Sequence, residues 1–181
     1  PIPAPQRRVT LVEHNAATAE AEQQARIADV EKALERIPLF SPVPHDLLHE
    51  LAIHAERRLY APGELVIQQG QEGEELFVVE RGAVEVLVGR GGECVATLER
   101  GQFFGEMSLL TGEQRKATVR TLGEATLLVV SKESLQPILE AAPELAHAIS
   151  DVLAEREIQL GRASDAPRPS DDEEVTQRRG E

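Results

Sequence analysis

The sequence predicts a mainly β fold with flanking helices, of the α+β class, in which an antiparallel β jelly roll (a double-stranded β-helix) lies between N-terminal helices and C-terminal lid helices. Short β-rich runs separated by glycine-containing turns fill residues 64–131, which is typical of a sandwich or barrel. Apolar residues recur at helical spacing on both sides of this region. With 181 residues, 41% of them hydrophobic, the chain is long enough to bury a core.

The N-terminal part predicts a connector helix within residues 14–38. Residues 1–13 are too short to fold alone, and Ala, Glu, Gln and Arg dominate the stretch from Thr18. One apolar stripe follows, and Pro38 ends the helix: Ile27, Val30, Leu34 and Ile37. Two interpretations of the stripe stay open, because it could pack on its own domain or dock on a partner.

The rest of the chain completes the fold in order. A second helix is expected to start at the cap-like Ser41, Pro42 and Pro44 and to continue through the apolar residues up to Ile53. The predicted strands follow, and "KESLQPILEAAPELAHAISDVLAEREIQL" returns to helix with a break near Pro143. Residues 161–181 are polar and proline-containing, which predicts a disordered acidic tail.

Composition excludes several classes of function. The net charge of −13, with 3% aromatic residues and no Trp, argues against nucleic-acid binding. A single cysteine, Cys94, excludes an internal disulfide. No apolar run is long enough for a membrane span, so a soluble polypeptide is expected. Since the first residue is not Met, we expect a piece of a longer parent protein.

Residues 103–119, "FFGEMSLLTGEQRKATV", place two charges in an apolar stretch. Gly105 allows a close approach to a ligand, the first amides of a helical turn can hold a phosphate, and Arg115 can add a charged fork. Glu106 would then accept from a hydroxyl, so a ribose phosphate satisfies both charges. The alternative is a solvated Glu106–Arg115 salt bridge, and spacing alone favours neither.

"FGEMSLLTGEQRKATV" resembles the phosphate-binding cassette of the cyclic nucleotide-binding domain family, and the similarity extends over about residues 39–160. Upstream, "PGELVIQQGQEGEELFVVERGAVEV" and "LFSPVPHDLLHELA" are also similar to this family. The resemblance implies that Arg115 binds the cyclic phosphate and that Glu106 accepts from the ribose 2′-hydroxyl. It also implies backbone or lining contacts for a further set: Gly105, Met107, Ser108, Ala117 and Thr118.

Two features bear on the choice of ligand: one departure from the family's cassette pattern, and the last helix, which in this family covers the base as a lid. Lys116 stands where cGMP-selective members of the family often have Thr, so the resemblance favours cAMP over cGMP and leaves base preference open. Lys116 could reach solvent or the phosphate. The last helix usually covers the base in this family, which makes Arg156, Ile158 and Leu160 candidates for the lid.

The N-terminal flank "IPAPQRRVTLVE" resembles the end of the cytoplasmic domain of small-conductance mechanosensitive channels, with Ala4 departing from the usual aromatic residue. This implies a cyclic nucleotide sensor appended to a bacterial channel, at the cytoplasmic face of the inner membrane. The partners would be the nucleotide and the rest of the channel, in a homo-oligomer that is heptameric by resemblance. The alternative is a regulatory or interaction module on another effector, with or without ligand binding.

Signals for an enzyme are weak, so the prediction is a binding domain with no catalytic residues and no cofactor. "HELAIH" lacks the H-E-x-x-H spacing of zinc proteases. His45 and His49 stand four residues apart and could share a metal, but the sequence shows no third ligand, so no metal site is predicted. The acidic pair Glu74 and Glu75 is expected to face solvent in a hairpin turn.

Overall fold

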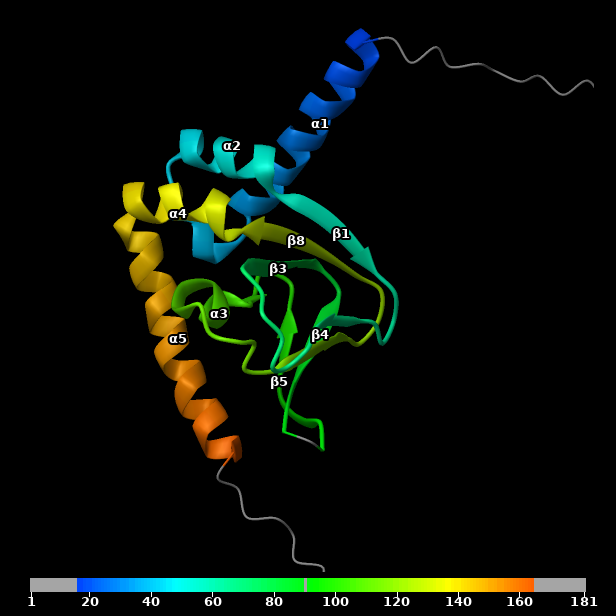
Figure 1. Cartoon of the computed structure of the whole chain (residues 1–181). Coiled ribbons are helices and arrows are strands. Elements are labelled where there is room, and N and C mark those ends of the chain that lie inside the picture. The colour runs from blue at the N-terminus through cyan, green and yellow to red at the C-terminus, as the bar shows by residue number, and fades with distance from the viewer. Residues whose placement is uncertain (1–15, 90, 165–181) are drawn as a thin grey trace, which may run out of the picture.

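The structure is a computed structural model that describes residues 16–89 and 91–164 (Figure 1). Its elements in chain order are α1 (Ala16–Glu35), η1 (Pro38–Phe40), α2 (His45–His54), β1 (Glu56–Tyr60), β2 (Leu65–Ile67), β3 (Glu75–Arg81), β4 (Ala83–Val88), β5 (Glu93–Glu99), β6 (Phe103–Phe104), α3 (Glu106–Thr111), β7 (Thr118–Thr121), β8 (Ala125–Ser131), α4 (Lys132–Ala141) and α5 (Pro143–Ser164).

The strands form two antiparallel four-stranded sheets, in the orders β1-β8-β3-β6 and β2-β7-β4-β5. Alternation along β3 explains how they pack, because successive side chains of a strand point to opposite faces. Phe77 and Val79 lie in a cluster with Val84 and Val119 of the second sheet. Leu76 and Val78 belong instead to the cluster formed with the helices. The first sheet is therefore buried on both faces, between the second sheet and the helices.

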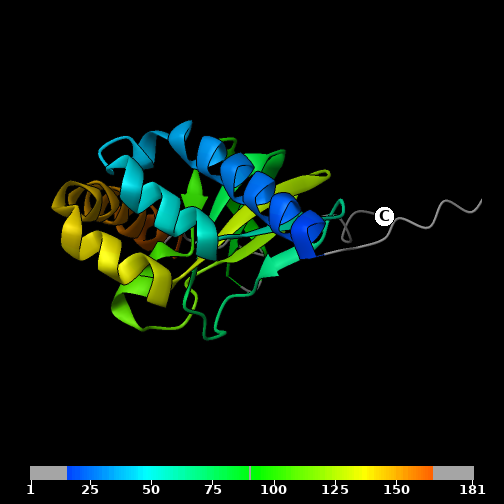
Figure 2. The same ribbon diagram turned by 90° about the horizontal axis from the view of Figure 1, so that it is seen from above.

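The helices α1, α2 and α4 lie side by side over the first sheet (Figure 2). Val30, Leu34 and Ile37 of the predicted stripe are buried in the same core as Leu51 of α2 and Leu135 of α4. The stripe therefore packs on its own domain, which is the first of the two interpretations left open by the sequence. Residues 19–26, in the first half of α1, are exposed, and this half projects away from the rest of the fold (Figure 1).

Several boundaries differ from those expected. Helix α2 begins at His45 with Pro44 at the N-cap position, whereas Ser41 ends η1, where its N–H donates to the Pro38 carbonyl. Strand β1 was missed because its sequence, "ERRLY", is charged; it is an edge strand whose Leu59 is exposed. Helix α5 continues through residues 161–164, where a tail was expected. The predicted channel remnant, 1–13, lies outside the described residues.

The mixed class of helices with antiparallel sheet is confirmed, whereas the jelly-roll closure stays a prediction. Across residues 16–89 and 91–164, no helix combines the length and the apolar character that crossing a bilayer requires.

Candidate functional site

The segment 103–119 folds as a strand, a sharp turn, a short helix and a return to strand. Phe103 and Phe104 form β6, and Gly105 then adopts φ +89° and precedes α3. A Cβ at Gly105 would lie 2.6 Å from the Glu75 carbonyl oxygen and 2.7 Å from Arg115 Nη1. Only glycine combines this backbone conformation with so close an approach. Gly105 therefore sets the path of the chain into the cassette.

Arg115 is buried, with 4% of its surface exposed, and is held by the loop that surrounds it. Its Nη1 donates to the Glu75 carbonyl at 3.0 Å, to the Gly105 carbonyl at 2.9 Å and to Ser108 Oγ at 2.7 Å. Burial lowers the pKa of the Arg115 guanidinium, and the nearby carboxylates of Glu75 and Glu106 oppose that shift. A fixed, partly desolvated cation of this kind is suited to binding an anion.

Glu106 is also buried, with 2% exposed, and its partner comes from the last helix. Arg156 Nη1 donates to Glu106 Oε1 at 2.6 Å, and Arg156 Nη2 donates to the Phe103 carbonyl at 2.7 Å. The Arg156 guanidinium also lies over the Phe103 ring, 5.0 Å from its centroid. Glu106 Oε2 is buried and has no hydrogen-bond partner among the described residues. One oxygen of Glu106 thus ties α5 to the cassette, and the other remains an unused acceptor.

A cavity of about 610 Å³ brings these groups together. Its polar end contains Glu106, Ser108 and Arg115, and Arg156 reaches it from α5. Its walls are mostly apolar, from β2, β4, β5 and β7: Ile67, Val86, Val95, Leu98 and Val119. Helix α5 adds Ala148, Val152 and Glu155 and passes beside α3 (Figure 1). The cavity can therefore hold a ligand whose apolar part lies beside an anion and a hydroxyl.

Residues 57–142 match the family model described as "Cyclic nucleotide-binding domain". The chain contains a cyclic nucleotide-binding domain. Among curated relatives, "Cyclic nucleotide-gated channel beta-3" of Mus musculus is 34% identical over 110 residues, which are 59% of this chain and 16% of that protein. "Cyclic nucleotide-gated channel alpha-4" of Rattus norvegicus is 32% identical over 117 residues, 61% of this chain and 20% of that protein. The chain thus spans a minor part of the relatives it matches.

Solved structures share the fold of this cyclic nucleotide-binding domain. The regulatory domain of Toxoplasma gondii PKA with cAMP has a TM-score of 0.64 at 18% identity, covering 75% of this chain and 51% of that one. The regulatory subunit of a cAMP-independent protein kinase A from Trypanosoma cruzi, bound to guanosine, has a TM-score of 0.61 at 22% identity, covering 80% and 48%. At these identities the likeness concerns the fold, and the two neighbours differ in what they bind.

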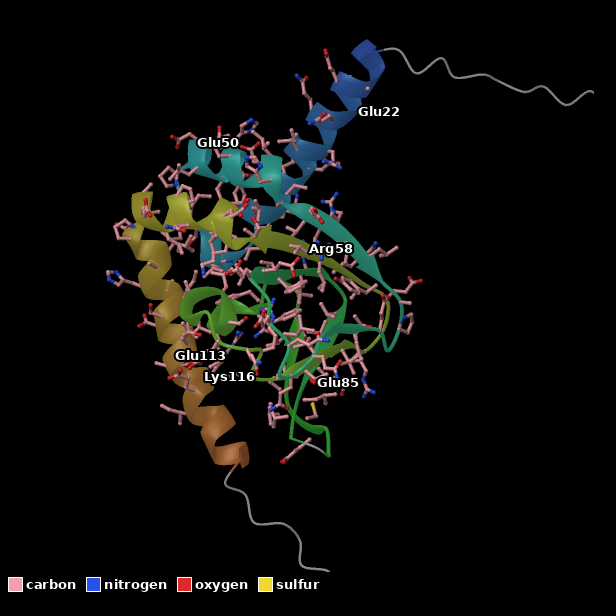
Figure 3. The ribbon with its side chains drawn as sticks, viewed as in Figure 1. Glu22, Glu50, Arg58, Glu85, Glu113 and Lys116 are labelled. Atoms are coloured by element: carbon pink, nitrogen blue, oxygen red, sulfur yellow. The ribbon has the colours of Figure 1, made fainter. Side chains whose placement is uncertain are left out.

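Most of the predicted site residues line the cavity of the domain: Gly105, Glu106, Met107, Ser108, Arg115, Lys116, Ala117 and Arg156. Glu106 and Arg115 are both buried and do not form the solvated salt bridge considered from the sequence. Lys116 Nζ lies 2.7 Å from Glu113 Oε2, and the two side chains lie together on the loop after α3 (Figure 3). In this structure Lys116 therefore makes an exposed ion pair beside the cavity.

Two predicted residues, Thr118 and Ile158, lie outside the cavity lining. Thr118 is not part of the cavity lining, and its Oγ1 accepts a hydrogen bond from the Gln69 backbone N–H. Ile158 is 57% exposed and does not reach the cavity. The side chain of Leu160 lies outside the described residues. Of the three lid candidates, Arg156 contacts the cassette because it lies on the face of α5 turned towards α3.

Sequence patterns did not identify three other residues that contact or closely approach Arg115. Glu75 was expected in a solvent-facing turn, but it begins β3, its carbonyl accepts from Arg115, and its carboxylate lies 4.0 Å from Arg115 Nη2. The Phe77 ring centroid lies 5.7 Å from the Arg115 guanidinium carbon. A Cβ on Gly73 would lie 2.5 Å from Arg115 Nε and Nη2. These contacts join segments about 40 residues apart in sequence, and no local pattern encodes such pairings.

Replacement of Gly73 by Ala should weaken anion binding without unfolding the domain. The new methyl group would displace the Arg115 guanidinium from the three acceptors that hold it. We expect cyclic nucleotide affinity to fall about tenfold, which corresponds to about 1.4 kcal/mol. Isothermal titration calorimetry measures it. Gly123→Ala is the matched control, because a Cβ there meets nothing within 4 Å; an equal loss in both variants would contradict the assignment.

Proposed function

We propose that this chain is a cyclic nucleotide sensor, with cAMP preferred over cGMP. The observation that carries the proposal is the pair of buried, oppositely charged side chains, Glu106 and Arg115, in one mostly apolar cavity. A buried charge is costly unless it is compensated, and Glu106 Oε2 lacks any partner in the part of the chain that the structure describes. A ligand with an anionic phosphate and a nearby hydroxyl matches this arrangement.

Each part of the ligand has a group to receive it. Arg115 would bind the cyclic phosphate, with the first amides of α3, at Met107 and Ser108, completing the contact. Glu106 Oε2 would accept from the ribose 2′-hydroxyl while Oε1 keeps Arg156. The base would lie against the apolar wall, towards Val152 of α5. Because Lys116 replaces the Thr often found in cGMP-selective members of the family, we propose cAMP as the preferred ligand.

Regulation would follow from differential binding to two arrangements of α5. Arg156 joins α5 to Glu106 and to the Phe103 carbonyl, so a ligand at Glu106 changes the surroundings of the contact that docks this helix. A ligand biases a conformational equilibrium only through its difference in affinity for the two states, and about 1–3 kcal/mol is typical of such coupling.

The output that we propose is gating of a bacterial channel of the mechanosensitive type. Curated relatives of the chain are cyclic nucleotide-gated channels. The N-terminal flank instead resembles small-conductance mechanosensitive channels, and this resemblance points to the mechanosensitive type. In that protein the domain would lie at the cytoplasmic face of the inner membrane, in a heptamer, with α1 linking it to the pore. The alternative is a regulatory or interaction module on another effector, with or without ligand binding.

A 2′-hydroxyl comparison tests the ligand and the role of Glu106 together. Calorimetric titration should show saturable binding of cAMP, and 2′-deoxy-cAMP should bind about 10- to 100-fold more weakly, because a hydrogen bond to a charged group contributes about 1.5–3 kcal/mol. In Glu106→Gln the difference between the two ligands should shrink.

Parallel titrations separate the alternatives. Guanosine and adenosine lack the phosphate, so binding of either nucleoside as tightly as cAMP would contradict the role of Arg115. No binding of cAMP or cGMP, with an unchanged melting temperature, would favour a module that has lost its ligand.

A further inference from the structure

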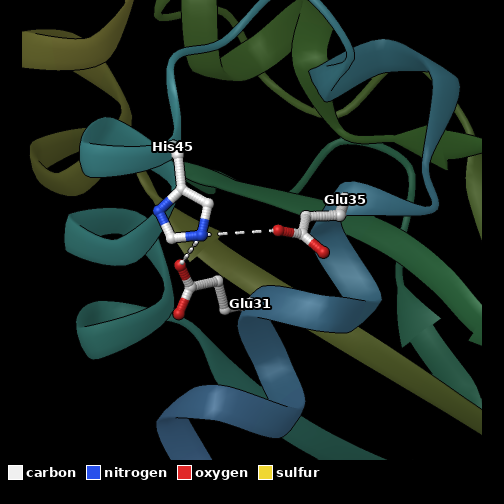
Figure 4. A group of neighbouring side chains, drawn as sticks. All are labelled: Glu31, Glu35 and His45. Atoms are coloured by element: carbon white, nitrogen blue, oxygen red, sulfur yellow. Dashed lines mark ion pairs between the residues drawn. The ribbon is translucent and has the colours of Figure 1, made fainter.

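A second group of polar side chains lies away from the nucleotide cavity, where α1 crosses α2. Glu31 and Glu35 stand four residues apart on α1, and His45 and His49 stand four apart on α2. Residues at this spacing share one face of a helix. The tertiary structure turns the two faces towards each other, so the carboxylates supply the further ligands that the sequence around His45 and His49 did not show (Figure 4).

The geometry within this group matches metal coordination. His45 Nε2 lies 3.2 Å from Glu31 Oε1 and 3.6 Å from Glu35 Oε1, and one ligand atom from each of the three residues lies within 4.8 Å of the others. In a tetrahedral site with bonds near 2.0 Å, ligand atoms are about 3.3 Å apart. One position remains for water, which is the usual composition of a site with three protein ligands.

The buried member of the group shows why a cation belongs here. The Glu31 side chain is only 12% exposed, and its Oε1 is buried without a hydrogen-bond partner in the described part of the chain, although His45 Nε2 is near. Two lone-pair-bearing atoms in this position need a proton or a metal ion between them. Glu31 Oε2 lies 3.1 Å from His49 Nδ1, so this contact fixes the carboxylate and leaves Oε1 for the ion.

We propose that Glu31, Glu35 and His45 bind one divalent transition-metal ion of the zinc class, with His49 as a positioning residue for Glu31. Imidazole with carboxylate favours Zn²⁺, Co²⁺ or Ni²⁺ over Mg²⁺ and Ca²⁺, which prefer oxygen ligands alone. His45 and Glu35 are largely exposed, with 75% and 44% of their side chains accessible, so the ion can enter from solvent.

The ion would fasten the connector helix to the domain. Val30 and Leu34 already hold the C-terminal half of α1 in the core, which gives the ligands from α1 a fixed position. A metal bridge from Glu31 and Glu35 to α2 adds a connection that depends on metal concentration. This inference does not rest on the proposed nucleotide binding, because none of the three ligands lines the nucleotide cavity.

The test uses the whole chain with Cys94→Ser, since the exposed Cys94 thiol could itself bind zinc. Titration with Co²⁺ should give the intense visible absorption of tetrahedral cobalt at one equivalent, and Zn²⁺ should displace it. Zinc should also raise the melting temperature. His45→Gln and Glu31→Gln should each reduce zinc affinity more than tenfold, and His49→Gln about tenfold, as is usual for residues that orient a ligand.

Matched controls use the histidines outside the group, with His54→Gln on α2 and His147→Gln on α5, and both should keep parental affinity. His14→Gln does the same for the histidine outside the described residues. Equal losses in the control variants, Mg²⁺ binding as tight as zinc, or no cobalt absorption would overturn the proposal and leave His–Glu ion pairs alone. Circular dichroism of each variant separates a lost ligand from a lost fold.

Discussion

Replacing Arg115 by Leu is expected to abolish cyclic nucleotide binding while the domain stays folded. The guanidinium is the buried cation of the cavity, and we expect two charge-assisted hydrogen bonds to the phosphate at about 1.5–3 kcal/mol each. Their loss corresponds to a fall in affinity of on the order of 100-fold or more. Calorimetric titration of the wild type and the variant with cAMP measures the difference.

The stability of this variant should change much less than its affinity. Leu removes the Arg115 hydrogen bonds to the Glu75 and Gly105 carbonyls and to Ser108 Oγ, at a cost of about 1–3 kcal/mol. The Gly105 carbonyl keeps the Leu109 N–H as a donor, and the change also removes a desolvated charge. Arg120→Leu is the control, because Arg120 pairs with Glu85 on an exposed part of β7. Unchanged affinity in the folded Arg115 variant would refute the phosphate role.

Replacing Arg156 by Ala should destabilise the domain and loosen α5. The change removes the hydrogen bonds to Glu106 and to the Phe103 carbonyl and leaves the Glu106 carboxylate buried with no partner on either oxygen. Breaking a buried ion pair on one side costs about 3–5 kcal/mol. Since Arg156 keeps 21% of its side chain exposed, we expect about 2–4 kcal/mol in chemical denaturation, with faster amide exchange in α5.

A more exposed pair provides the comparison. Arg57 donates two hydrogen bonds to Glu80, and with side-chain exposures of 34% and 21% this pair should contribute only about 0–1 kcal/mol. Arg57→Ala should therefore change stability little. Adding Glu106→Gln to Arg156→Ala should recover part of the loss, because the amide carries no charge. Additive losses in the double variant would show that Glu106 and Arg156 are not coupled.

Local sequence patterns predicted the elements whose signals are periodic. The stripe of α1, the glycine-separated strands and the break at Pro143 all lie where periodicity and turn residues put them. Strand β1 was missed since its charged residues occupy an edge position, where pairing with β8 rather than burial defines the strand. Segment boundaries at Ser41 and in 161–164 shifted by a few residues because capping and helix continuation depend on neighbouring contacts.

The sequence by itself determined the class of fold and the cassette, because Gly105, Glu106 and Arg115 lie within eleven residues and their chemistry follows from their types. Only the tertiary structure decided which residues complete each site. Arg156 meets Glu106 across 50 residues, and Glu75 meets Arg115 across 40. Glu31 and Glu35 meet His45 because α1 and α2 pack face to face. Hydrophobic burial drives these helices and strands together without regard to sequence separation, and the polar partners are set by where the packed elements cross.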